Sequence, residues 1–242
     1  MLNDRAGRIL EAVIREFVED GAPVSSDELY NDYNFGIKPA SIRAELLRLT
    51  NAGFLEQPHT SGGRVPTERA YRFWVDGLVD DLFADIAELG ALAVARAHYA
   101  TLGADVPSAV EAVAGALRLL GAGYAEGESE VSKTGLDELC HRMDFQTRED
   151  FLEVVHDFER LDDSVRRFAS HAGLGSTPKV YIGESPLTRS PHLSVVAARY
   201  SAGGVPAVVI AIGPKRMDYK KALKVFKELP AGKRKKEVRH KK

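Results

Sequence analysis

One stretch constrains this chain more than any other, namely residues 53–76, which read GFLEQPHTSGGRVPTERAYRFWVD. Two short apolar runs flank a loop rich in Pro and Gly, and the polar residues of that loop are His59, Thr60, Ser61 and Arg64. A helix start follows directly, with Thr67 in the N-cap position. A helix, then a hairpin with a small, polar and cationic tip, then another helix is the layout of a winged helix-turn-helix. The sequence therefore predicts this fold for the N-terminal part of the chain.

The residues before the hairpin supply the helices that such a fold requires. Apolar residues recur at 3.6-residue spacing between Ile9 and Val18, which predicts a first helix over about 4–20 that ends at Gly21. Ser25 and Glu28 have the spacing of a capping box for a short second helix. The segment 34–37 is expected to form the turn, and Pro39 suits the first turn of a third helix.

Charge is distributed unevenly along the chain, although the formal net charge is only −2. Residues 1–37 carry a net charge of −5, residues 38–72 carry +3, and the tail 230–242 carries +6. A polyanion is therefore expected to meet the second half of the N-terminal domain rather than the whole molecule.

The third predicted helix carries the first group of candidate contacts to nucleic acid. Small residues near its start permit a close approach to base edges, and its arginines can reach a phosphate or a guanine. The candidates are Lys38, Ser41, Arg43 and Arg48. The alternative is an ordinary amphipathic helix with surface charges, which the position between the turn and the hairpin disfavours.

The hairpin tip carries the second group, which comprises His59, Thr60, Ser61, Gly63 and Arg64. Glycines at the tip allow positive φ angles and a close backbone approach to phosphate, and Arg64 adds charge beside them. The alternative is a surface hairpin with a flexible tip. His59 is either a donor to the backbone of the nucleic acid or a solvated residue, and no second His or Cys lies near it at metal-ligand spacing.

The rest of the chain predicts an α+β domain. A long helix is expected from Thr67 to about residue 97, followed by helices over about 106–121, 134–142 and 147–170. Three β-rich segments separated by Gly, Pro and Ser then predict an antiparallel sheet of three or more strands: Lys179–Ile182, Leu193–Tyr200 and Val205–Ile212. A final helix over about 217–229 completes the domain.

These patterns divide the chain into four parts. We expect a winged-helix domain over 1–85, a linker helix region over 86–105, an α+β domain over 106–229 and a disordered basic tail over 230–242.

The sequence gives little support to a membrane protein, a secreted protein or an enzyme. The longest apolar run has eight residues and contains Pro206, the N-terminus has no signal-peptide pattern, and Cys140 is the single cysteine. A cytoplasmic protein without membrane spans is therefore expected. We find no phosphate-binding glycine loop after a strand and no Ser/His/Asp set, so we expect neither an enzyme nor a bound cofactor or metal.

Two blocks of this sequence resemble the HrcA-type heat-inducible transcription repressors. The first block covers about 4–80 and includes PVSS at 23–26, ASIR at 40–43, GFLEQPHTS at 53–61 and GRVPT at 63–67. The second includes YIGE at 181–184, SVV at 194–196 and IGPKRMDY at 212–219. Two long blocks in the same order make a chance resemblance improbable.

This resemblance implies a winged helix joined to a GAF-like α+β domain. It also implies repression of chaperone operons through an inverted-repeat operator in double-stranded DNA, binding as a homodimer, and modulation by the chaperonin GroEL. The chain departs from the family between Tyr124 and Gly135, where it is too short to hold the inserted dimerising domain, so a reduced GAF-like domain is expected. In the third helix Ala44 stands where the family usually has Asn, and Pro39 stands where a small polar residue is usual.

Two other functions remain as hypotheses. A small-molecule sensor would need a polar, concave pocket between residues 179–212 and the helices. An enzyme with a winged-helix appendage would need a tight cluster of titratable groups in the C-terminal half. The operator sequence, the regulated genes and the role of the basic tail do not follow from the sequence.

Overall fold

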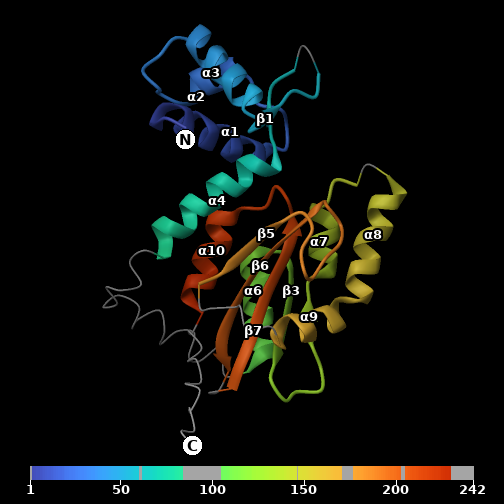
Figure 1. Ribbon diagram of the computed structural model, residues 1–242. Coiled ribbons are helices and arrows are strands. Elements are labelled where there is room, and N and C mark those ends of the chain that lie inside the picture. The colour runs from blue at the N-terminus through green and yellow to red at the C-terminus, as the bar shows by residue number, and fades with distance from the viewer. Residues whose placement is uncertain are drawn as a thin grey trace, which may run out of the picture. The chain divides into compact units, whose positions relative to one another are not determined.

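A computed structural model describes residues 2–59, 62–83, 105–145, 147–170, 177–202 and 205–229. The chain divides into two compact units. The first comprises Met1–Asp80 together with the turn Lys215–Asp218, and the second comprises the remaining residues. Each unit is described separately below (Figure 1).

The first unit begins with three helices, as the sequence predicted. Helix α1 (Asp4–Asp20) ends at Gly21, whose φ of 71° is left-handed. Helix α2 (Ser26–Asp32) has the complete capping box between Ser25 and Glu28. Helix α3 (Pro39–Asn51) begins with proline in its first turn. The apolar faces of α1 and α3 form the core of this unit with Leu29, and its fully buried members include Ile9, Ile14, Ile42 and Leu49.

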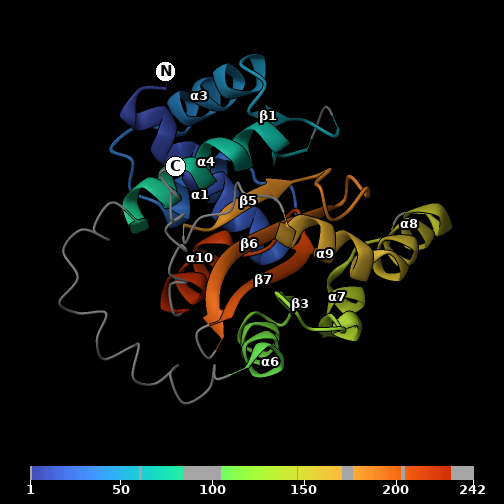
Figure 2. The same cartoon turned by 60° about the horizontal axis from the view of Figure 1, so that its bottom comes forward.

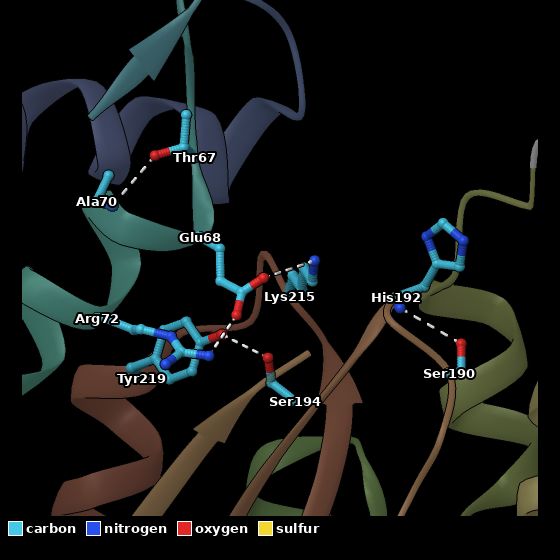
Figure 3. Close-up of polar contacts among 9 residues, drawn as sticks. All are labelled: Thr67, Glu68, Ala70, Arg72, Ser190, His192, Ser194, Lys215 and Tyr219. Carbon is cyan, nitrogen blue, oxygen red and sulfur yellow. Dashed lines mark hydrogen bonds and ion pairs between the residues drawn. The ribbon is translucent and has the colours of Figure 1, made fainter. Parts of the chain in front are cut away.

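A short hairpin follows α3 and is the predicted wing. Strand β1 (Leu55–Glu56) pairs antiparallel with strand β2 (Val65–Pro66), with Leu55 opposite Pro66 and Glu56 opposite Val65. Helix α4 (Glu68–Phe83) follows Thr67, whose hydroxyl accepts a hydrogen bond from the Ala70 amide (Figure 3). The winged helix-turn-helix is therefore confirmed. The part of the predicted long helix between residues 84 and 97 lies outside the described residues.

The second unit is built on a five-stranded antiparallel sheet with the strand order β4-β3-β7-β6-β5. Its strands are β3 (Leu120–Ala125), β4 (Ser132–Thr134), β5 (Lys179–Ile182), β6 (Leu193–Ala202) and β7 (Val205–Pro214). The three predicted strands are present, so the α+β class with an antiparallel sheet is confirmed. Strands β6 and β7 are almost continuously apolar and buried, because helices cover both faces of the sheet (Figure 2).

One face of this sheet is covered by α7 (Leu136–Arg142), α8 (Arg148–Glu159) and α9 (Leu161–Ser170). Their buried residues Leu139, Val154 and Val165 join one apolar cluster with Leu120, Val195, Val208 and Ile210 of the strands. The other face carries α6 (Val106–Leu117) and α10 (Tyr219–Glu228). On this face the Tyr219 hydroxyl lies 2.8 Å from the Ser194 hydroxyl (Figure 3).

Two of the helix limits predicted from sequence were wrong. Helix α6 ends at Leu117, with Arg118 in a left-handed conformation, and residues 120–121, predicted to end this helix, belong to strand β3 (residues 120–125). The segment LGAGYA has little intrinsic strand preference, and the strand exists because it pairs with β4 and β7. Likewise, the predicted helix 147–170 is two helices that meet at Arg160.

The link between β3 and β4 comprises only residues 126–131. It therefore has no room for an inserted domain, as the sequence indicated. No helix among the described residues is both long enough and apolar enough to cross a lipid bilayer.

Candidate nucleic-acid interface

Helix α3 has one buried face and one exposed face. Ile42, Leu46 and Leu49 are buried, and Glu45 is buried beside them. The opposite face is exposed and carries Ala40, Ser41, Arg43, Ala44, Leu47, Arg48 and Asn51. Because the buried residues fix the rotation of the helix in its unit, they also fix which side chains face outward. Three of the four α3 candidates lie on this exposed face, and Lys38 precedes it as the N-cap residue.

The cationic side chains of this region differ in whether they already have a hydrogen-bond or ion-pair partner. Among the described residues, neither Lys38 nor Arg43 engages its side chain in a hydrogen bond or an ion pair. Arg48 instead places Nη1 3.0 Å from Oε1 of the buried Glu45. The positive charge that faces solvent without a local partner is therefore concentrated at the start of α3.

Two further arginines of the basic stretch have structural partners. Arg69 Nη1 donates to the Ala52 carbonyl at 2.8 Å, and its guanidinium lies over the Phe54 ring at 4.6 Å. Arg72 pairs with Glu68, which also lies 3.5 Å from Lys215 Nζ within the first unit (Figure 3). Arg69 thus fixes the start of α4 against the end of α3. Because both arginines already have partners, the net charge of +3 overstates what the region offers to an anion.

The wing candidate Arg64 is half-buried and anchored at three points. Its amide donates to the Val24 carbonyl at 2.7 Å, and its carbonyl accepts from the Val24 amide at 2.9 Å. Its Nε donates to the Thr50 hydroxyl at 3.0 Å, and that hydroxyl donates in turn to the Leu46 carbonyl of α3. Arg64 therefore joins the wing both to the segment before α2 and to the last turns of α3.

Gly63 is needed for a different reason from the one that the sequence suggested. Its φ is not left-handed, and a Cβ atom at this position would lie 2.5 Å from the carbonyl carbon and oxygen of Val24. The close approach is thus to the backbone of the same unit. At the tip, His59 is exposed and its carbonyl accepts from the Gly62 amide at 2.9 Å. Thr60 and Ser61 lie outside the described residues.

One outward-facing residue of α3 was not among the candidates from sequence. Leu47 is 52% exposed, one of the largest apolar exposures in the described part of the chain. No local signal distinguished it, because consecutive apolar residues of a helix can both face the core, as Ile9 and Leu10 do on α1.

A small hollow of about 190 Å³ lies between α1 and the turn after α2, lined in part by Arg8, Arg15 and Tyr33. The Tyr33 hydroxyl donates to Glu16 at 2.5 Å. Partial burial and this carboxylate raise the pKa of Tyr33 to about 12, so the phenol stays protonated at neutral pH. Tyr33 therefore cannot serve this hollow as an acid or base near neutral pH.

The second unit has a hollow of about 320 Å³ beside α6 and β4, lined in part by Glu111, Glu130 and Lys133, whereas the core under the sheet is closely packed. The cavity between the sheet and α7, α8 and α9 measures about 10 Å³, which holds at most one water molecule. Its polar residue Asp157 is buried and accepts hydrogen bonds from the Arg189 and Ser190 amides at 2.9–3.0 Å. In the described residues, no three His, Cys, Asp or Glu side chains are grouped to hold a metal ion.

Comparison with known proteins gives three further findings. The family model "HrcA protein C terminal domain" matches residues 88–223. The heat-inducible transcription repressor HrcA of Clostridium perfringens is 45% identical over 80 residues, which are 33% of this chain and 24% of that protein. The repressor of the same name from Natranaerobius thermophilus is 50% identical over 78 residues, or 32% of this chain and 23% of that protein. The aligned stretch thus spans about a quarter of the length of these relatives.

A solved structure shares the fold of the chain. It was described as a hypothetical protein at 2.2 Å resolution, and it superposes with a TM-score of 0.72 at 17% identity over 94% of this chain and 96% of that one. At this identity the likeness establishes the fold alone. The family match extends over more than half of the chain and includes most of the second unit, and on this basis the chain belongs to the HrcA family.

Proposed function

We propose that this protein is a DNA-binding transcriptional repressor of heat-shock and chaperone genes that binds an inverted-repeat operator as a homodimer. The observation that carries the proposal is the arrangement of α3 and the wing. Helix α3 presents small residues and two cations without local partners, and a hairpin is fixed beside it through Arg64 and Thr50. Such a pairing allows one helix to enter the major groove while the wing lies along the phosphate backbone.

The family supports the regulatory part of the proposal. The relatives are named heat-inducible transcription repressors, and a shared role would place operators of this protein in front of chaperone genes. Modulation by the chaperonin GroEL follows from the same resemblance, and residence in the cytoplasm is also part of the proposal.

The core of the second unit gives no support to a small-molecule sensor that binds its effector between the sheet and α7, α8 and α9. A sensor needs a cavity that can hold its effector, and the cavity between the sheet and α7, α8 and α9 measures about 10 Å³. An effector would have to displace buried side chains such as Leu139 and Leu161, which are each 1% exposed. Opening this core would cost several contacts at once.

The experiment that tests the proposal is recovery of genomic DNA fragments by the purified full-length protein, followed by sequencing. We expect the recovered fragments to share an inverted repeat and to lie upstream of chaperone genes. Titration of one such duplex against a random duplex at fixed salt should then show a preference of at least about a thousandfold. Recovery of fragments without a common motif would contradict sequence-specific repression.

A further inference from the structure

The outward face of α3 has an apolar centre. Residues three and four positions apart lie on one side of a helix, so Ala40, Ala44, Leu47 and Asn51 form a line along the exposed face. Arg43 borders this line on one side and Arg48 on the other. A single exposed leucine is ordinary on a protein surface. The position of Leu47 is what makes it informative, because it lies at the centre of the face that meets DNA in the proposed function.

The neighbours of Leu47 leave it protruding. Ala40 and Ala44 on the preceding turns are small, and Arg48 directs its guanidinium to Glu45 on the buried side of the helix. When such a face enters the major groove, the leucine side chain loses water together with the base edge that it meets. Burial of a polar edge against a hydrocarbon is costly, because its donors and acceptors lose their partners.

One base edge in the major groove avoids this cost. Thymine presents its C5-methyl group there, and an apolar side chain favours that methyl over the polar atoms of the other bases. We propose that Leu47, backed by Ala44, contacts a thymine methyl group in each operator half-site and so sets part of the sequence specificity. The inference rests on the proposed function and goes beyond it by assigning a specificity-determining residue and the base that it selects.

The geometry also limits where the thymine lies. Arg43 and Leu47 are four residues apart, which is about 6 Å along the helix. If α3 follows the groove, the methyl group is expected within about two base pairs of the base that Arg43 contacts.

The test removes the methyl group alone. In a duplex recovered by the full-length protein, each thymine of one half-site is replaced in turn by deoxyuridine, which keeps every donor and acceptor and lacks only the C5-methyl. We expect the wild-type protein to lose affinity by about threefold to fivefold at one or two positions, as burial of one methyl group predicts. Leu47→Ala should lose a similar factor on the unmodified duplex and show no further loss with deoxyuridine at those positions.

A matched control is Leu152→Ala, which removes the same side chain from an exposed position on α8 and should keep the full response to deoxyuridine. Because Leu47 is exposed, the unfolding temperature of Leu47→Ala should equal that of the wild type. The inference is overturned if no deoxyuridine substitution weakens the wild type, or if Leu47→Ala keeps the same response. It is also overturned if Leu47→Ala changes only the oligomeric mass. If the wild type prefers no sequence over a random duplex, the proposed function fails first and this inference fails with it.

Discussion

At the scale of single residues, the arginines of α3 and the wing differ in how much of each guanidinium is already engaged. Arg43 has no local partner among the described residues, whereas Arg48 neutralises the buried Glu45 and Arg64 donates to Thr50. The change in affinity caused by removal of Arg43 therefore reports on its contact with DNA alone. Removal of Arg48 or Arg64 also breaks a contact inside the first unit.

We expect Arg43→Ala to reduce discrimination between operator and random duplex by about 1–3 kcal/mol, the range for a bidentate contact to a base edge. Arg43→Lys is the control, because it keeps the charge and loses the planar fork. Ser41→Ala and Arg48→Ala complete the series, and at least one of the three alanine variants should lose discrimination. Titrations of both duplexes check this. If all three alanine variants keep the wild-type ratio of operator affinity to random-duplex affinity, α3 does not read the base sequence.

Arg64→Ala should weaken binding to all duplexes by a similar factor and reduce the slope of log affinity against log salt by about 1, as the loss of one phosphate contact predicts. Thr50→Val separates this charge from the anchoring contact, because it removes the acceptor of Arg64 Nε and keeps the guanidinium. The salt slope of Thr50→Val should equal that of the wild type. An unchanged slope for Arg64→Ala would leave Arg64 with a positioning role only.

At the scale of elements, the wing keeps its place because its backbone touches a segment about 40 positions earlier in the sequence. The bridge between Val24 and Arg64 brings Gly63 so close to residues 23 and 24 that no side chain fits there. The wing is thus held by backbone contacts as well as by its own two-residue strands.

Gly63→Ala should lower the free energy of unfolding of the protein by about 1–3 kcal/mol, because the added methyl group overlaps the Val24 carbonyl. Gly62→Ala is the matched control, since its Cβ would lie 3.4 Å from the nearest atom, the His59 carbonyl oxygen. Urea unfolding of both variants checks the prediction. Equal free energies of unfolding for Gly63→Ala and Gly62→Ala would contradict this prediction, because they would show that the backbone at Val24 moves aside without loss of stability.

The second unit depends on a similar close approach between α6 and β3. A Cβ at Gly123 would lie 2.6 Å from Val110 Cγ2 and 2.9 Å from Val106 Cγ1. We expect Gly123→Ala to destabilise the protein by about 1–3 kcal/mol, and Val110→Ala to restore part of this in the double variant.

Gly115 provides the control for α6. It is exposed within the helix and has no atom within 4 Å of a Cβ position, so Gly115→Ala should raise stability by about 0.5–1 kcal/mol. Additive effects of Gly123→Ala and Val110→Ala in urea unfolding would contradict a direct contact between these positions.

At the scale of the whole molecule, an inverted-repeat operator requires two α3 helices related by a two-fold axis and spaced by whole turns of DNA, about 34–36 Å each. A single winged helix with so few unpaired cations would bind too weakly at physiological salt to repress a gene. The protein is therefore expected to dimerise although the link between β3 and β4 holds no inserted domain. The apolar side of the helix after Trp74 and the second unit are the proposed contacts. On this helix Leu78 is buried, Val79, Leu82 and Phe83 are half-buried, and Ile86 lies outside the described residues.

Light scattering at micromolar concentration should give twice the chain mass of 26.5 kDa, and two chains should bind one palindromic duplex. A duplex with a single half-site is the control and should bind with much lower affinity. A mass of 26.5 kDa together with a one-to-one complex on the full palindrome would contradict dimerisation. Repression would then require a partner protein.

The sequence by itself determined the elements whose signals are local. The capping box of Ser25 and Glu28, the left-handed Gly21 and the proline at the start of α3 each act within a few residues, and each formed as predicted. The strands β5, β6 and β7 were equally visible, because each is rich in β-branched or aromatic residues and is bounded by Gly, Pro or Ser.

Only the tertiary structure decided the features that join residues far apart in the chain. It made a strand of residues 120–125, assigned Gly63 to the Val24 backbone, engaged Arg64 with Thr50 and left Leu47 facing outward. In each case the deciding contact joins segments that are distant in sequence, or depends on which face of a helix the core covers. Local preference carries no information about such contacts, because their free energy comes from packing and pairing that exist only in the folded protein.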